Sequence, residues 1–154
     1  MGTEAVAGLV LAAGGSRRLG RPKQLLPYGD GTLLDHVLGT ARACRFDQLI
    51  CVLGGSSEDV RATVDLRGAD VVVNREFGTG CSSSIATALS TVDPRIDVLV
   101  LMLGDQPGVR PETVPAAGQE RGDGLRPDAR LIAEQEDEDV DARVDRAQRR
   151  RDRR

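Results

Sequence analysis

The sequence predicts an α/β fold in which helices cover both faces of a mostly parallel sheet, a three-layer αβα arrangement. Over the first two-thirds of the 154 residues, short apolar runs alternate with segments in which apolar residues recur every three to four positions. Such alternation is typical of parallel strands joined by helical crossovers, which should be right-handed. The runs are apolar at successive positions, which indicates strands buried on both faces.

Four segments are expected to be strands. The first is a continuous apolar run that ends directly before two glycines, and the last ends at a Gly-Asp pair. In chain order, the expected strands are Ala5–Ala13, Gln48–Leu53, Ala69–Val73 and Ile96–Leu103.

Three helices are expected between these strands. In Leu33–Ala43 the apolar residues share one helical face, Thr32 is the expected N-cap, and Asp35 suits the positive end of the helix dipole. The second expected helix is Ser57–Leu66, capped by Ser56 or Ser57, and the third is Ser82–Thr91.

The sequence changes character after Val114, which divides the chain into a folded region, 1–114, and a tail, 115–154. The tail has no aromatic residue and little apolar periodicity, and its blocks Glu134–Asp141 and Arg149–Arg154 are almost wholly acidic and basic. Such blocks are usually solvated or disordered. We expect a charged, disordered tail with little contact to the sheet, although a short helix around Leu131–Val144 is an alternative.

Composition narrows the classes of function. The net charge of −3 and pI of about 5.2 do not predict a nucleic-acid binder. The three cysteines lack C-x-x-C spacing and His36 is the only histidine, so a zinc site is not expected. Free thiols fit a reducing compartment, and we expect neither a signal peptide nor a membrane-spanning segment. We expect a cytoplasmic protein with no nucleic-acid or membrane partner.

The strongest functional signal is the loop after the first strand, which reads LAAGGSRRLGRPK from Leu11 to Lys23. Gly14 and Gly15 let the backbone approach a ligand closely, and exposed amides in such a turn can bind phosphate oxygens. Arg17, Arg18 and Lys23 add the positive charge that a triphosphate requires. Taken alone, Gly-Gly-Ser would also fit an ordinary surface turn.

Two common nucleotide motifs are excluded in this loop. Gly15 and Gly20 have the spacing of a P-loop, but Arg21 follows where that motif requires lysine. A dinucleotide fingerprint needs G-x-G-x-x-G opening a helix, which Gly14-Gly15-Ser16 does not match, and Pro22 disfavours a long helix there.

A second signal follows the fourth expected strand, which ends in Gly104-Asp105-Gln106-Pro107. An aspartate at the carboxyl end of a parallel strand faces the ligand crevice, and Mg²⁺ usually binds one or two carboxylates plus substrate phosphates. Taken alone, Asp105 would be better explained as a turn residue, since Asp-x-Pro is common in turns.

The complete loop resembles the signature L-A-A-G-x-S-x-R-x-G-x-x-K of MobA-like nucleotidyltransferases, the molybdenum cofactor cytidylyl- and guanylyltransferases. The next stretch, Gln24–His36, is similar to the cytidylyltransferase pattern in which L-P and an aromatic precede G-T-[IL]-L-D-H. Ala12-Ala13 also resembles the cytidylyltransferase form, because guanylyltransferases tend to read L-A-G-G. The resemblance covers roughly residues 5–113 and implies a Rossmann-like fold.

The resemblance also implies which residues form the site. Asn74–Ser84 resembles the family segment N-x-x-[WF]-x-x-G-x-x-S-S that contacts base and ribose, although capping and ligand contact remain equally open for Ser84. In the family G-D-x-P supplies a magnesium ligand, which assigns Asp105 to Mg²⁺. The implied catalytic residues are Lys23, Arg18 and Asp105. The implied nucleotide-binding residues are Leu11, Ala12, Ala13, Gly14, Gly15, Ser16, Lys23, Asn74, Gly80, Ser82 and Ser83.

The implied reaction transfers CMP from CTP to molybdopterin and releases pyrophosphate. The acceptor phosphate would attack the α-phosphorus, and Arg18 and Lys23 would neutralise charge on the leaving pyrophosphate. Mg²⁺ bound to Asp105 would polarise the α-phosphorus. In the family the first and fourth strands are neighbours, so Lys23 and Asp105 should approach one crevice. His36 has no metal or nucleophile constellation around it, so a packing role on its helix is expected.

The resemblance ends near Val114. No histidine follows His36, so the family's G-H-P segment and its further strands are absent. We hypothesise a truncated or frameshifted member whose four-stranded sheet exposes an edge, which would favour self-association. The alternatives are an NTP-binding remnant without turnover, a related transferase using another NTP or acceptor, and, ranked last, an oxidoreductase similar to nicotine-blue reductases.

Overall fold

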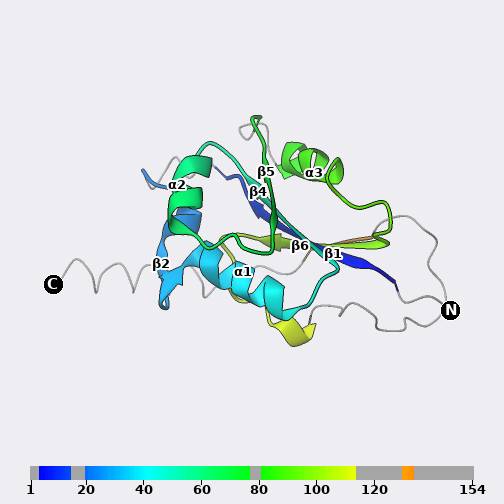
Figure 1. Ribbon diagram of the computed structural model, residues 1–154. Coiled ribbons are helices and arrows are strands. Elements are labelled where there is room, and N and C mark those ends of the chain that lie inside the picture. The colour runs from blue at the N-terminus through cyan, green and yellow to red at the C-terminus, as the bar shows by residue number, and fades with distance from the viewer. Residues whose placement is uncertain (1–3, 15–19, 77–80, 114–129, 134–154) are drawn as a thin grey trace.

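The computed structural model describes residues 4–14, 20–76, 81–113 and 130–133, which form a three-layer αβα fold (Figure 1). The central sheet is parallel, with strand order β5-β4-β1-β6-β7. Its strands are β1 (Val6–Ala12), β4 (Gln48–Leu53), β5 (Asp70–Val73), β6 (Val98–Leu103) and β7 (Arg130–Ala133). The predicted Rossmann-like fold class is confirmed.

Helices α1 (Leu33–Ala43) and α2 (Ser57–Thr63) cover one face of the sheet, and α3 (Cys81–Leu89) covers the other (Figure 1). The core is therefore split by the sheet into two apolar clusters. Strand β1 contributes to both because successive side chains point to opposite faces. Its Val10 packs with α1 and α2, whereas Leu9 packs with α3, and both are fully buried.

The start of α1 is fixed by a capping box, as the sequence suggests. Asp35 N donates to Thr32 Oγ1 at 3.1 Å, while Thr32 N donates to Asp35 Oδ2 at 3.0 Å. Asp35 Oδ1 also accepts from the amide of Asp65, which joins α1 to the connection between α2 and β5.

A short 3₁₀ helix and a two-stranded ribbon lie between β1 and α1. The 3₁₀ helix η1 (Lys23–Leu25) begins directly after Pro22, and β2 (Pro27–Tyr28) pairs antiparallel with β3 (Gly31–Thr32). Gly29 turns this ribbon with φ of 57°, a conformation that glycine adopts readily. Neither element was predicted, because two- and three-residue segments show no periodicity.

The expected tail contributes a strand to the sheet. Strand β7 pairs in parallel with β6, with Val98 opposite Arg130 and Leu101 opposite Ala133. The expectations of a tail apart from the sheet and of a helix from Leu131 are wrong for these four residues. The physical reason is that β6 offers unpaired backbone groups at its edge, which an apolar Leu-Ile-Ala run can satisfy. The expected exposed edge at β6 is therefore covered.

The remainder of 115–154 lies outside the described residues. The 3₁₀ helix η3 (Pro111–Thr113) lies between β6 and β7 in the chain. No helix within the described ranges is long and apolar enough to cross a bilayer.

Candidate active site

The carboxyl ends of β1 and β6 lie side by side and create the candidate site. Gly104 N donates to Leu11 O at 2.8 Å, directly beyond the paired residues Leu11 and Leu103. A Cβ at Gly104 would stand 3.0 Å from both Leu11 O and the Ala12 Cβ. Glycine is therefore the residue that lets the two strand ends approach, and it delivers Asp105 to the end of β1.

Lys23 and Asp105 come together where β1 and β6 end, as expected from the sequence. Lys23 Nζ lies 3.5 Å from Asp105 Oδ2, and the two side chains are 30% and 36% exposed. One arrives from η1, after the glycine-rich loop, and the other from the turn after β6. The site thus presents a cation and a carboxylate that remain accessible to a ligand.

Gln24 is a site residue that the sequence reasoning missed. Its side chain is 5% exposed, and its Nε2 donates to Ala12 O at 3.0 Å. This hydrogen bond ties the residue after Lys23 to the end of β1, so it closes the base of the loop. Only its position after the expected phosphate-binding lysine could have drawn attention to it, because a lone glutamine forms no motif.

The remaining predicted residues of this loop differ in how they lie. Ala12 and Ala13 are buried and Leu11 is half-buried, so nucleotide contacts there would come from backbone atoms, while Gly14 is exposed. Gly15, Ser16 and Arg18 lie outside the described residues.

Asn74 is the first residue after β5 and is buried. Its Nδ2 donates to Ser83 Oγ at 2.9 Å and to Ser84 Oγ at 3.0 Å, and its Oδ1 accepts from Glu76 N at 2.9 Å. All of these bonds are internal and the residue is only 2% exposed, so Asn74 organises the connection from β5 to α3. Ser84, left open by the sequence, is a buried partner of this amide.

The other predicted residues of this segment differ from Asn74 in their exposure. Ser82 is exposed on α3 and Ser83 is half-buried, so both hydroxyls are nearer to solvent than Asn74. Gly80 lies outside the described residues.

The surroundings of Cys51 and His36 indicate structural and not catalytic roles for these two side chains. Burial raises the pKa of the Cys51 thiol to about 12, so it stays protonated and is a poor nucleophile. His36 is exposed on α1 and contacts the Tyr28 ring edge-on, with ring centroids 4.9 Å apart, which fits the packing role expected for it.

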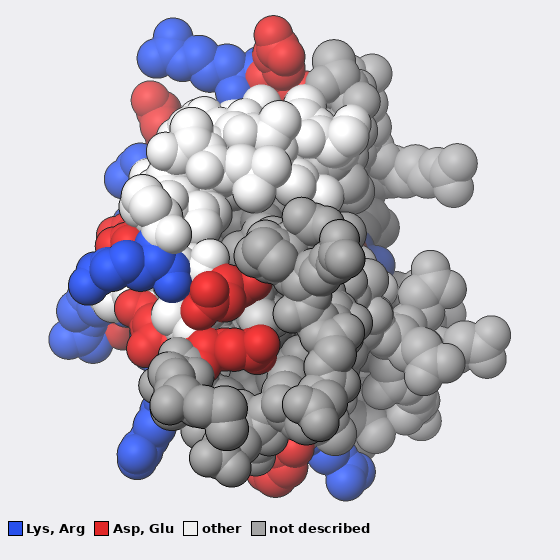
Figure 2. Space-filling view, turned by 90° about the vertical axis from the view of Figure 1, so that its right-hand side faces the viewer, with Lys and Arg blue, Asp and Glu red and all other residues white. Residues whose placement is uncertain are grey.

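The charge of the described surface is mixed (Figure 2). On the side shown, acidic side chains gather near the middle, with basic side chains at their border. Elsewhere, Arg95 and Asp93 form an exposed pair at 2.9 Å, and the hydrogen bonds from Arg95 hold the pKa of Asp93 at about 2. Exposed pairs of this kind contribute little to stability.

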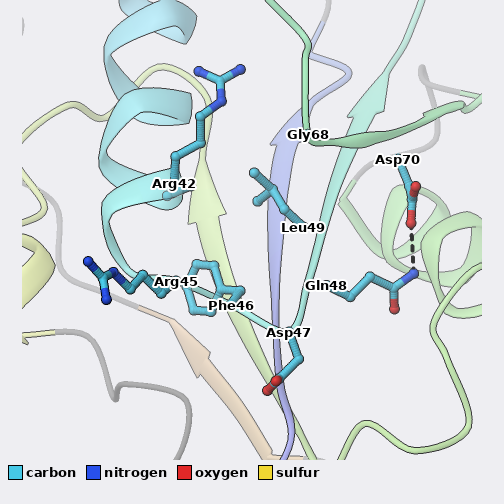
Figure 3. A pocket seen from close by; sticks show the side chains of 9 residues that line it. Arg42, Arg45, Phe46, Asp47, Gln48, Leu49, Gly68 and Asp70 are labelled. Atoms are coloured by element: carbon cyan, nitrogen blue, oxygen red, sulfur yellow. Dashed lines mark hydrogen bonds between the residues drawn. The ribbon is translucent and has the colours of Figure 1, made fainter.

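A hollow of about 360 Å³ opens at the opposite end of the strands, at the amino ends of β4 and β5 (Figure 3). Phe46 and Leu49 line it, with Arg42 on one side and Gln48 and Asp70 on the other. Gln48 Nε2 donates to Asp70 Oδ2 at 2.9 Å, and Arg42 donates to two backbone carbonyls. This hollow lies at the amino ends of the strands, whereas ligands of open α/β sheets bind at the carboxyl ends, so the site with Lys23 and Asp105 is the better candidate.

Cation binding at this site would depend on the substrate. Within the described ranges, no three His, Cys, Asp or Glu side chains are placed to hold a metal ion. Asp105 fits a cation that takes its other ligands from water and phosphate oxygens, which is the usual magnesium arrangement.

Comparison with known proteins places the chain among nucleotide-dependent transferases. Residues 8–141 match the model of the MobA-like NTP transferase domain. Nicotine blue oxidoreductase of Paenarthrobacter nicotinovorans is 36% identical over 110 residues, which are 71% of this chain and 53% of that protein. The chain spans about half the length of this relative.

Solved structures agree with the fold. Rv0371c of Mycobacterium tuberculosis H37Rv has 54% identity and a TM-score of 0.67, over 73% of this chain and 57% of that one. A further structure of Rv0371c is a complex with manganese. A nucleotidyl transferase from Methanothermobacter has 28% identity and a TM-score of 0.62, over 71% and 54% of the two chains.

Proposed function

Because the chain belongs to the MobA-like NTP transferase family, we propose that it binds a nucleoside triphosphate and a divalent cation where β1 and β6 end. The observation that carries the proposal is the pairing of Lys23 with Asp105 at the base of the glycine-rich loop. A triphosphate needs a cation for its phosphates, and a divalent metal needs a carboxylate. The site offers one cation and one carboxylate where β1 and β6 end.

The proposed reaction is nucleotidyl transfer. An acceptor phosphate oxygen attacks the α-phosphorus, the bond from that phosphorus to the bridging oxygen breaks, and pyrophosphate leaves with the electron pair. Lys23 neutralises charge on the phosphates, and the amides of the loop from Gly14 orient them. Asp105 would hold the divalent cation, which polarises the phosphate oxygens when bound. The chain needs no nucleophile of its own, and buried Cys51 offers none.

We propose CTP as the nucleotide, Mg²⁺ as the cation and molybdopterin as the acceptor. The support is the cytidylyl-like Ala12-Ala13 and the pattern from Gln24 to His36. The manganese complex of Rv0371c supports a divalent cation in this family without selecting magnesium. Titration with CTP and GTP in the presence of Mg²⁺ tests the nucleotide, and tighter GTP binding would overturn the cytidylyl assignment.

Turnover is tested separately from binding. Exchange of labelled pyrophosphate into CTP should occur with molybdopterin but not without it, because no covalent nucleotidyl-enzyme forms, and it should be abolished in Asp105→Asn. The chain spans about half of its relatives, so nucleotide binding without exchange would favour the alternative of a binding module without turnover. Exchange only with a different acceptor would identify a related transferase.

The likeness to nicotine blue oxidoreductase favours an oxidoreductase as a second candidate. The absence of a G-x-G-x-x-G fingerprint in the sequence argues against nicotinamide binding in the usual manner. Reduction of a blue quinonoid dye with NADH or NADPH, in the absence of CTP, would favour this candidate.

A further inference from the structure

The ion pair between Lys23 and Asp105 has a consequence for how ligands enter the site. Lys23 Nζ lies 3.5 Å from Oδ2 of Asp105, the carboxylate to which the proposed function assigns the cation. Both side chains retain about a third of their exposure, so neither is fixed by burial. The ammonium therefore already neutralises the carboxylate that the proposed function gives to the metal.

A divalent cation and this ammonium compete for one carboxylate. Two positive charges within a few ångströms of one another repel, so a metal on Asp105 disfavours the present position of Lys23. The described residues supply no further carboxylate cluster at which the metal could be held instead. Phosphate oxygens offer Lys23 another anionic contact and so make Asp105 more available to the metal.

We propose that Lys23 is the internal cation of Asp105 in the nucleotide-free protein, and that triphosphate and metal enter by an exchange of partners. Lys23 passes from the carboxylate to the phosphates, and the divalent cation takes its place on Asp105. Each ligand thereby favours the other, because binding free energies are reciprocally coupled. The inference rests on the proposed function and adds to it the reason why metal binding depends on nucleotide.

The exchange predicts opposite effects of one substitution on two ligands. Lys23→Met should tighten Mn²⁺ binding without nucleotide by up to about fivefold, the factor expected from losing a part-exposed ion pair. The same variant should bind metal-free CTP more weakly than the wild type does, with a smaller loss for cytidine. Electron paramagnetic resonance of free Mn²⁺ and calorimetric titration of nucleotide in EDTA measure the two effects on the full chain.

Two further variants separate the exchange from a general effect of charge. Arg21→Met removes one exposed positive charge from the same segment and should change Mn²⁺ affinity less than Lys23→Met does. In the Asp105→Asn background, Lys23→Met should no longer tighten Mn²⁺ binding, although it should still weaken CTP binding. Those three results together support the exchange.

Other outcomes show whether the exchange of partners or the proposed function is wrong. Equal Mn²⁺ affinity in the wild type and Lys23→Met, or equal tightening in Arg21→Met, overturns the exchange while leaving the proposed function standing. Failure of the wild type to bind either CTP or GTP overturns the proposed function, and the nucleotide half of the exchange with it.

Discussion

Asp105 is the residue at which the two explanations left by the sequence can be separated. As a turn residue it would need only its backbone and a polar side chain, whereas as a metal ligand it needs its charge. Its Oδ2 lies 3.5 Å from Lys23 Nζ, so the structure already uses the negative charge that a turn residue would not need.

Asp105→Asn should preserve the fold and weaken Mg²⁺-dependent CTP binding by about tenfold or more, the value of a charge-assisted contact. The side chain is 36% exposed, so no buried group loses its partner. Calorimetric titration at several Mg²⁺ concentrations gives the measurement. Asp30→Asn, an exposed aspartate in the β2–β3 turn, is the matched control. An unchanged magnesium dependence would return Asp105 to the turn.

Gln24→Met should lower the free energy of unfolding by about 1–3 kcal/mol, because Ala12 O would lose its donor in a buried setting. Methionine keeps the length of the side chain and removes only the amide. Urea unfolding followed by circular dichroism measures the change. Gln106→Met, at a half-buried glutamine of the turn after β6, should be close to neutral. Similar small losses in both variants would mean that this hydrogen bond does not hold the base of the loop.

At the scale of elements, apolar patterning predicted the long segments well. Strands β1, β4, β5 and β6 and helix α1 fall where it placed them, since each buries a run or a face that the sequence displays. It missed η1, the β2–β3 ribbon and β7, which are short and depend on contacts with distant segments. Within the site it predicted that Lys23 and Asp105 would meet but not the bridge from Gln24, because a hydrogen bond across a loop leaves no periodic trace.

The packing of Phe46 on β1 provides a test of how tightly these elements fit. A Cβ at Gly8 would collide with the Phe46 ring, which follows the end of α1. Gly8→Ala should therefore lower the free energy of unfolding by about 1–3 kcal/mol through overpacking. Combining it with Phe46→Leu should recover part of that loss, which a double-mutant cycle of urea unfolding would reveal. Additive losses would show that the cost of Gly8→Ala does not come from the Phe46 ring.

At the scale of the whole molecule, the edge of the sheet is the feature that sequence reasoning judged wrongly. Strand β7 covers the edge of β6, although it comes from the charged region after Val114. Charge density hid this short apolar stretch, because disorder was inferred from the average of the region. The match to the family domain likewise extends to residue 141.

Ile132→Pro should uncover the β6 edge, because proline lacks the amide that a ladder needs and resists pairing in a sheet. We expect faster amide hydrogen exchange across Val98–Leu103 and a larger fraction of oligomer in sedimentation experiments. Ile132→Val keeps the amide and should behave like the wild type. Unchanged exchange in the proline variant would mean that β6 does not rely on β7.

The place of β1 in the sheet also bears on how the chain is made. Strand β1 lies between β4 and β6, both of which follow it in the chain and are therefore synthesised later. At the usual rates of translation, roughly 5–20 s separate the appearance of β1 from that of β6. During that interval one edge of an almost wholly apolar strand has no partner, a state that favours aggregation. The proposed pairing of Lys23 with a ligand-binding Asp105 can form only after β6 has been synthesised, because Asp105 follows that strand.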